Sequence, residues 1–158
     1  MAQVKTNALR ILDAKKISYE VLTYDNKDGK IDGISVAAKI GRNPKEVFKT
    51  LVAQGASKNL FVFVIPVEAE LDLKKVAKVA GEKNVEMIAV KDIQKWTGYI
   101  RGGCSPIGMK KEYKTFLDKS SLGLDSIIVS AGKIGVQIVI DPNQLQELTK
   151  AEFADLLK

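Results

Sequence analysis

Two strand-like apolar runs, separated by a short polar gap, occupy the middle of the chain. Residues 47–54 and 60–67 are rich in the β-branched and aromatic side chains that favour strands. The gap between them is Gly55-Ala56-Ser57-Lys58-Asn59. This arrangement predicts a β-hairpin with a five-residue turn. No apolar run approaches the roughly 20 residues that a membrane-spanning helix needs, so no membrane association is expected.

Helical and strand-like segments surround this hairpin without regular alternation. Residue spacing predicts helices over 4–16, 35–40, 71–80, 91–97, 142–148 and 151–157. It predicts further strands over 17–23, 85–90, 115–118, 126–130 and 136–139. Since strands and helices do not follow a strict βαβ order, the predicted class is α+β with a mixed sheet. The length of 158 residues predicts a single domain over residues 1–158.

Two residue counts exclude several kinds of chemistry. The chain has no histidine, which removes histidine general bases and imidazole metal ligands. Its one cysteine, Cys104, leaves no internal disulfide and no cysteine-based zinc site. We therefore expect no metal and no cofactor. A single thiol and the lack of an apolar leader over residues 1–6 indicate a cytoplasmic protein.

The net charge of +6 comes from 25 basic and 19 acidic residues. It favours an anionic partner but does not identify one. Lysines gather at residues 74–83 and again at 110–119. No sequence motif of an RNA-recognition module accompanies them.

Lys49 lies inside an apolar strand. If Phe48 and Thr50 face one side of that strand, Lys49 shares the other face with Val47 and Leu51. Two interpretations remain open. Lys49 is either an edge-strand lysine whose stem covers apolar surface, or a lysine held in a cleft, where desolvation lowers its pKa.

The segment 98–111 contains four glycines and one proline, so it cannot be regular structure for long. Its central part is Gly102-Gly103-Cys104-Ser105-Pro106. Such a loop either lets backbone N–H groups approach a ligand closely or forms a structural turn. It matches neither a Walker loop nor a dinucleotide-binding motif. Without a histidine partner, Cys104 is interpreted as a pocket-lining residue rather than a nucleophile.

Four segments stand out in order along the chain: Phe48-Lys49-Thr50-Leu51, Lys91–Gly98, the glycine-rich residues 98–108, and Ser130-Ala131-Gly132-Lys133. Taken together, they resemble the YbaK/EbsC family. This family comprises free-standing relatives of the editing insertion domain of bacterial prolyl-tRNA synthetases. The match runs from the first predicted helix to the last. It implies an α+β fold with a curved, partly barrel-like mixed β-sheet flanked by helices.

The resemblance also implies an activity. The family releases amino acids wrongly attached to tRNA, and its YbaK branch removes cysteine from Cys-tRNA(Pro). We therefore expect a trans-editing deacylase for tRNA(Pro), with tRNA(Cys) as a second substrate, prolyl-tRNA synthetase as a candidate partner and a monomer as the default state. The implied catalytic residue is Lys49. The implied substrate-binding residues are Tyr24, Thr50, Gly102, Gly103, Cys104, Ser105, Pro106, Ser130 and Gly132.

A site without histidine suits a substrate that brings its own nucleophile. The resemblance implies that the cysteinyl thiol attacks its own ester carbonyl and leaves as a thiolactone. The protein would then orient the ester and stabilise the oxyanion, a task that suits the backbone N–H groups of residues 102–105. Lys49 would act as a charge rather than a base. Two alternatives stay open: a water-using hydrolase for another amino acid, such as Ala-tRNA(Pro), and a non-catalytic RNA-binding or regulatory module.

Overall fold

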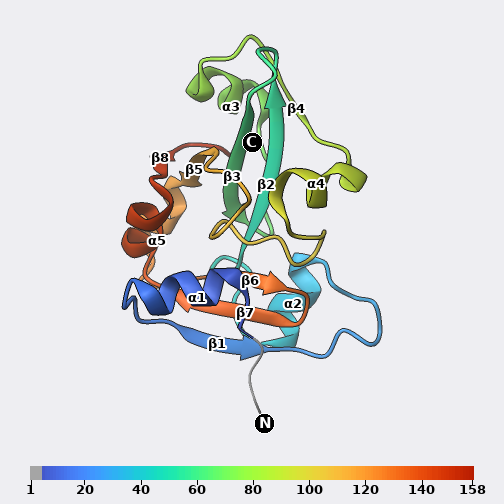
Figure 1. Cartoon of the computed structure of the whole chain (residues 1–158), viewed down its shortest axis with the longest axis vertical. Coiled ribbons are helices and arrows are strands. Elements are labelled where there is room, and N and C mark those ends of the chain that lie inside the picture. Colours follow the sequence, from blue (N-terminus) through green and yellow to red (C-terminus); the bar gives the residue numbers. More distant parts are fainter. Residues whose placement is uncertain (1–4) are drawn as a thin grey trace.

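A computed structural model describes residues 5–158, and its strands form two sheets (Figure 1). The strands are β1 (Glu20–Thr23), β2 (Phe48–Gly55), β3 (Leu60–Pro66), β4 (Val85–Met87), β5 (Lys114–Asp118), β6 (Ile127–Lys133), β7 (Val136–Ile140) and β8 (Glu152–Ala154). The three-stranded sheet has the order β1-β7-β6, and the five-stranded sheet has the order β4-β2-β3-β5-β8. In the five-stranded sheet, the β3–β5 and β5–β8 pairs are parallel and the other pairs are antiparallel. The predicted mixed sheet is therefore confirmed.

The helices pack around these sheets and confirm the α+β class. They are α1 (Asn7–Ala14), α2 (Gly33–Lys39), α3 (Leu73–Ala80), α4 (Ile93–Thr97) and α5 (Pro142–Thr149), with short 3-10 helices η1 (Val90–Asp92) and η2 (Lys119–Gly123). Helix α1 covers the three-stranded sheet, and α3 lies at the opposite end of the molecule beside β4 (Figure 1). Among the described residues, no helix is long and apolar enough to cross a membrane.

The two sheets meet just before β2. Val47 forms an isolated parallel bridge with Ile128 of β6, and the Ile128 N–H donates to the Glu46 carbonyl at 2.9 Å. The sheet system is curved, as expected, but residues 5–158 do not close it into a barrel. This junction brings the beginning of β2 next to β6 and β7.

The predicted hairpin is confirmed as the pair β2–β3, in which Lys49 lies opposite Ile65 and Thr50 opposite Val64. Strand β3 is buried along its whole length because apolar clusters lie on both of its faces. Val62 and Val64 belong to the cluster shared with α1 and the three-stranded sheet. Alternate residues belong to the second cluster, beneath α3. The hairpin is therefore a rigid support for Lys49.

The helix predicted over residues 151–157 is wrong. Residues 152–154 form β8, which pairs in parallel with β5. Helix α5 ends at Thr149, and the C-cap residue Lys150 turns the chain with a left-handed φ of 58°. The fully buried Leu156 then donates its N–H to an Asp118 carboxylate oxygen at 3.0 Å. A tertiary contact with a distant strand thus decides the conformation of this segment.

Two predicted helices show how the chain begins a helix. The helix predicted over residues 35–40 begins two residues earlier as α2, because Asp32 caps it and its carboxylate accepts the Ser35 N–H at 3.1 Å. The helix predicted over residues 142–148 is confirmed as α5, which Asp141 caps and Pro142 begins.

Candidate functional site

A cavity of about 110 Å³ lies where the two sheets meet. Five of the predicted site residues line it: Lys49, Thr50, Gly102, Cys104 and Ser130. They come from β2, the glycine-rich loop and β6, which are far apart in sequence. The other lining residues are Ile31, Gly33, Val36, Val47, Phe48, Val67 and Gln137, so the cavity is mostly apolar with a few polar groups. This composition is typical of a small-ligand site.

Lys49 is the cationic group of this cavity. It lies on β2 opposite Ile65 of β3, before the part of β2 that pairs with β4, and its side chain is half-buried. Burial lowers the pKa of the Lys49 ammonium, and the nearby Glu70 carboxylate partly opposes this. Since Lys49 lines the cavity and its side chain is half-buried, the structure favours the cleft interpretation over the edge-strand interpretation.

Two further polar side chains point to a ligand. The Thr50 hydroxyl oxygen is buried and has no hydrogen-bond partner among residues 5–158. Gln137 of β7 lines the same cavity, is only 5% exposed, and lies opposite Ser130 in the β6–β7 register. Buried polar groups normally find partners, so these two are the natural contacts for a polar ligand. Sequence reasoning missed Gln137, because a glutamine within an alternating strand normally faces solvent.

The glycine-rich loop is tied together at its base. The Lys110 N–H donates to the Thr97 carbonyl at 3.0 Å, and the buried Tyr99 hydroxyl donates to the Ile107 carbonyl at 2.6 Å. Gly102 has a left-handed φ of +85°, and a Cβ there would lie 2.7 Å from the Ile31 side chain. Glycine is therefore required at this position by both backbone conformation and space.

Only some of loop residues 102–106 line the cavity. Gly102 and Cys104 line the cavity, whereas Gly103 packs on the β6–β7 turn and donates its N–H to the Ile100 carbonyl at 3.0 Å. Ser105 is fully buried, and its hydroxyl accepts the Ile107 N–H at 3.2 Å. Pro106 lines a separate groove beside α1 and α5. The structure thus does not bring Gly103, Ser105 or Pro106 into the cavity.

The Cys104 thiol stays protonated near neutral pH. Burial raises its pKa to about 11, although a contact of 3.9 Å with the Thr97 hydroxyl opposes this shift. A thiol with a raised pKa is a poor nucleophile at pH 7. This supports the interpretation of Cys104 as a lining residue.

Of the remaining predicted residues, Gly132 and Tyr24 do not line the cavity, and Gly132 is held by the cavity residue Ser130. The Ser130 hydroxyl accepts the Gly132 N–H at 3.1 Å, and Gly132 leaves room for the Tyr99 ring, which lies 2.7 Å from the position of a Cβ there. Tyr24 does not line the cavity. Its N–H donates to the Gly135 carbonyl at 3.0 Å, and its buried hydroxyl has no partner among the described residues.

Residues 32–148 match the family model "Aminoacyl-tRNA editing domain". The chain belongs to this family. It is 45% identical over 154 residues to the Enterococcus faecalis protein named "Putative Cys-tRNA(Pro)/Cys-tRNA(Cys) deacylase EbsC", covering 98% of this chain and 94% of that one. It is 26% identical over 153 residues to a proline–tRNA ligase of Burkholderia multivorans, covering 94% of this chain and 26% of the ligase.

The fold of this editing domain also recurs among solved structures. A structure titled "Crystal structure of a putative trans-editing enzyme for prolyl tRNA synthetase" superposes with a TM-score of 0.83 at 22% identity. The superposition covers 99% of each chain. The editing-domain fold expected from the sequence is therefore confirmed. Within residues 5–158, no group of three or more acidic, cysteine or histidine side chains is placed to hold a metal ion.

Proposed function

We propose that this editing-domain protein is a trans-acting aminoacyl-tRNA deacylase that removes cysteine from mischarged Cys-tRNA(Pro), with Cys-tRNA(Cys) as a second substrate. The observation that carries the proposal is the cavity of about 110 Å³ that Lys49, Thr50, Gly102 and Cys104 line together. The high identity to the EbsC protein, whose name gives the same two tRNAs, supports this choice of substrate.

The size and lining of the cavity suit a small amino acid esterified to a terminal adenosine. Apolar side chains surround most of it, and the polar groups gather on β2, β6 and β7. A hydrophobic pocket discriminates poorly between amino acids whose side chains differ by one group, so the shape of the cavity alone does not make the reaction selective for cysteine. Selectivity follows if the thiol of the cysteinyl substrate is itself the reacting group.

The proposed reaction is an intramolecular acyl transfer. The cysteinyl sulfur forms a bond to its own ester carbonyl carbon, and the bond from that carbon to the ribose oxygen breaks. The thiol proton goes to the ribose oxygen, so the products are a thiolactone and uncharged tRNA. The protein lowers the barrier by holding the ester in the attacking conformation. The backbone N–H groups of Gly102 and Cys104, which line the cavity, are the proposed oxyanion donors.

Lys49 has a binding role in this reaction. Its ammonium group is partly desolvated, so its charge acts more strongly on a neighbouring anion or carbonyl than it would in water. We propose that it holds the terminal adenosine's phosphate or the aminoacyl group, and that Thr50, Ser130 and Gln137 position the ester. We further propose that Tyr24 shapes the rim, while Gly103, Ser105, Pro106 and Gly132 act by holding the loop in place.

The proposal extends to the assembly and its location. Residues 1–158 act as one editing domain and as a monomer, in the cytoplasm, where charged tRNA is used. A domain of this size contacts little beyond the acceptor end of a tRNA. Prolyl-tRNA synthetase is therefore the proposed partner that supplies tRNA selection.

The test is deacylation of tRNA(Pro) charged with cysteine, alanine or proline. We expect rapid loss of cysteine alone. We also expect no turnover of α-aminobutyryl-tRNA(Pro), in which a methyl group replaces the thiol. Preference for alanine would identify a water-using editing hydrolase, and no turnover of any ester would favour a non-catalytic RNA-binding module.

A further inference from the structure

The loop that forms one wall of the cavity also carries a set of cations. Residues 91–111 contain Asp92 as their single acidic residue. The five basic residues in the same segment are Lys91, Lys95, Arg101, Lys110 and Lys111, all of them exposed. The segment therefore has a net charge of +4, two thirds of the excess charge of the whole chain, which is +6.

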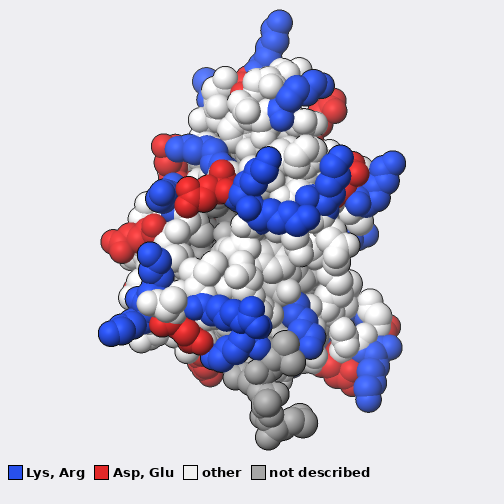
Figure 2. Space-filling model, in the orientation of Figure 1, with Lys and Arg blue, Asp and Glu red and all other residues white. Residues whose placement is uncertain are grey.

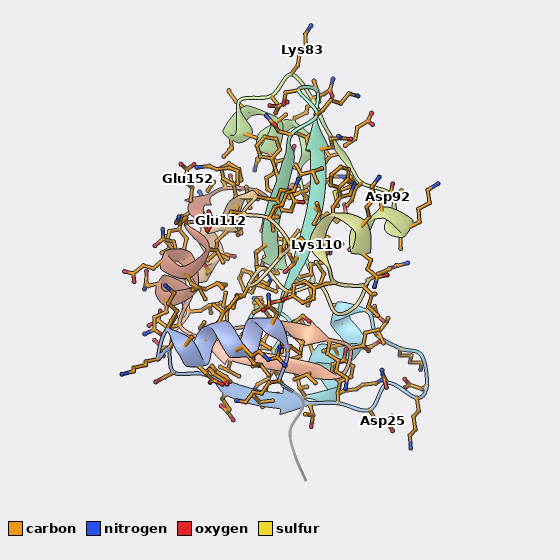
Figure 3. All side chains as sticks on the ribbon, in the orientation of Figure 1. Asp25, Lys83, Asp92, Lys110, Glu112 and Glu152 are labelled. Atoms are coloured by element: carbon orange, nitrogen blue, oxygen red, sulfur yellow. The ribbon has the colours of Figure 1, made fainter. Side chains whose placement is uncertain are left out.

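These cations are not neutralised by neighbouring acids. The ion pairs within residues 5–158 use other lysines and arginines. Glu112, which follows the segment directly, pairs with Lys150 at 3.6 Å. Lys95 lies over the Trp96 ring at 5.0 Å, a contact that leaves its charge in place. Basic side chains cross the middle of the face shown in Figure 2, and Lys110 lies in that region in Figure 3.

Contacts connect these cations to the cavity. Gly102 lines the cavity, and the exposed Arg101 precedes it directly. At the base of the loop, the Lys110 ammonium donates to the Lys95 carbonyl at 3.3 Å, which places these two residues side by side. The hydrogen bond between Lys110 and Thr97 fixes this base. The cations thus belong to one continuous segment, made of η1, α4 and the glycine-rich loop, whose two ends are tied together by the hydrogen bonds of Lys110.

A further cation lies on the neighbouring turn. A Cβ at Gly103 would lie 2.9 Å from the Ile134 nitrogen, so the loop touches the β6–β7 turn. Exposed Lys133 is the last residue of β6, directly before that turn. Arg101 and Lys133 therefore lie on either side of the contact between the loop and the turn, next to the cavity.

We infer that Lys95, Arg101, Lys110 and Lys133 bind the phosphodiester backbone of the RNA strand whose aminoacylated end enters the cavity. This inference rests on the proposed function, because it concerns the same substrate. The charged nucleotide is the end of a chain, so the preceding phosphates have to leave the cavity across its rim. Unpaired lysines and arginines are the usual phosphate contacts of proteins.

The test is binding of uncharged tRNA(Pro) to the full chain at several salt concentrations. The variant carries K95A, R101A and K110A. Its matched control carries K74A, K78A and K83A, which removes three equally exposed lysines that take part in no ion pair within residues 5–158. These lie on or next to α3, and Figure 3 shows Lys83 at the top of the molecule, away from Lys110 in its middle.

We expect the loop variant to bind tRNA at least about tenfold more weakly at low salt. The slope of log affinity against log salt should become shallower by about 2, since each contact to single-stranded RNA contributes about 0.7. The control should change affinity less than about twofold. Unchanged circular dichroism and melting temperature will show that both variants are folded.

Equal losses in the two variants would overturn the inference, since total charge would then explain binding. Unchanged tRNA affinity of the loop variant would also overturn the inference. An acidic protein would then be the better candidate partner for this basic surface. Undetectable binding by the wild type at low salt would likewise overturn the inference. Uncharged tRNA contains no ester, so failure here is separate from failure of the proposed deacylation.

Discussion

The Tyr99 hydroxyl donates a 2.6 Å hydrogen bond to the Ile107 carbonyl, which joins the two limbs of the glycine-rich loop. Both groups are buried, and burial raises the pKa of Tyr99 to about 12, so the hydroxyl keeps its proton at any physiological pH. The tyrosine ring also fills the space that Gly132 leaves open. This contact holds Gly102 and Cys104 against β2 and β6.

Tyr99→Phe should therefore destabilise the protein by about 1–3 kcal/mol, because it leaves the buried Ile107 carbonyl without its partner. Urea unfolding measures this change. Tyr19→Phe is the control, since the Tyr19 hydroxyl donates to Asp13 at an exposed site, where the loss should stay below about 1 kcal/mol. Equal effects of the two substitutions would contradict the anchoring role of Tyr99.

Gly102→Ala should lower deacylation by about tenfold to hundredfold, since displacement of a cavity wall by about 1 Å is enough for such a loss. The added methyl group meets Ile31, and alanine is strained at a φ of +85°. Gly123→Ala is the matched control, because no atom lies within 4 Å of its Cβ position and its φ is not positive. Wild-type deacylation rates for G102A would mean that the position of the glycine-rich loop does not affect the reaction.

Gln137→Leu should reduce kcat/KM for Cys-tRNA(Pro) by about three- to tenfold, the usual range for one lost hydrogen bond. The side chain is buried beside the cavity, so leucine keeps most of the volume while removing the amide. Gln144→Leu, at an exposed position of α5, should leave the steady-state parameters unchanged. If both variants behave like the wild type, Gln137 does not contact the substrate.

Alkylation of Cys104 by iodoacetamide should be slow at pH 8 and should speed up toward pH 11. Burial raises the pKa of this thiol from 9.0 to about 11, so its thiolate fraction at pH 8 is about a hundredfold below that of an ordinary thiol. Because the folded protein holds this proton more tightly than the unfolded chain, its contribution to stability declines as the pH rises above about 9. A reactivity midpoint at or below pH 9 would contradict the buried, protonated thiol.

Local patterns in the sequence were enough to predict much of the fold. The β2–β3 hairpin follows from two apolar runs and a short turn, and the start of α5 follows from Asp141 and Pro142. Residues 151–157 show where such patterns fail. Their apolar spacing fits a helix, but β5 offers a free edge, and only the tertiary structure shows that β8 pairs with it.

Part of the candidate site was also predictable from local sequence motifs. Lys49 and Ser130 were recognised from motifs, and the structure brings both to one cavity. All five residues from Gly102 to Pro106 were expected to bind the substrate. Gly103 and Ser105 instead form hydrogen bonds to other residues of the loop and so stabilise its conformation. Gln137 carries no distinguishing sequence signal, because its burial arises from the way β7 packs beside β6 and β1.

The rate of cysteine release from Cys-tRNA(Pro) by wild type, Lys49→Ala and Lys45→Ala tests the central claim most directly. Lys45 is exposed, lies four residues before Lys49 and takes part in no ion pair within residues 5–158. We predict rapid release by the wild type and by K45A, and a loss of about a hundredfold or more in K49A, the usual cost of removing a charge that stabilises the reacting group. Equal rates for K49A and the wild type would contradict the proposed site.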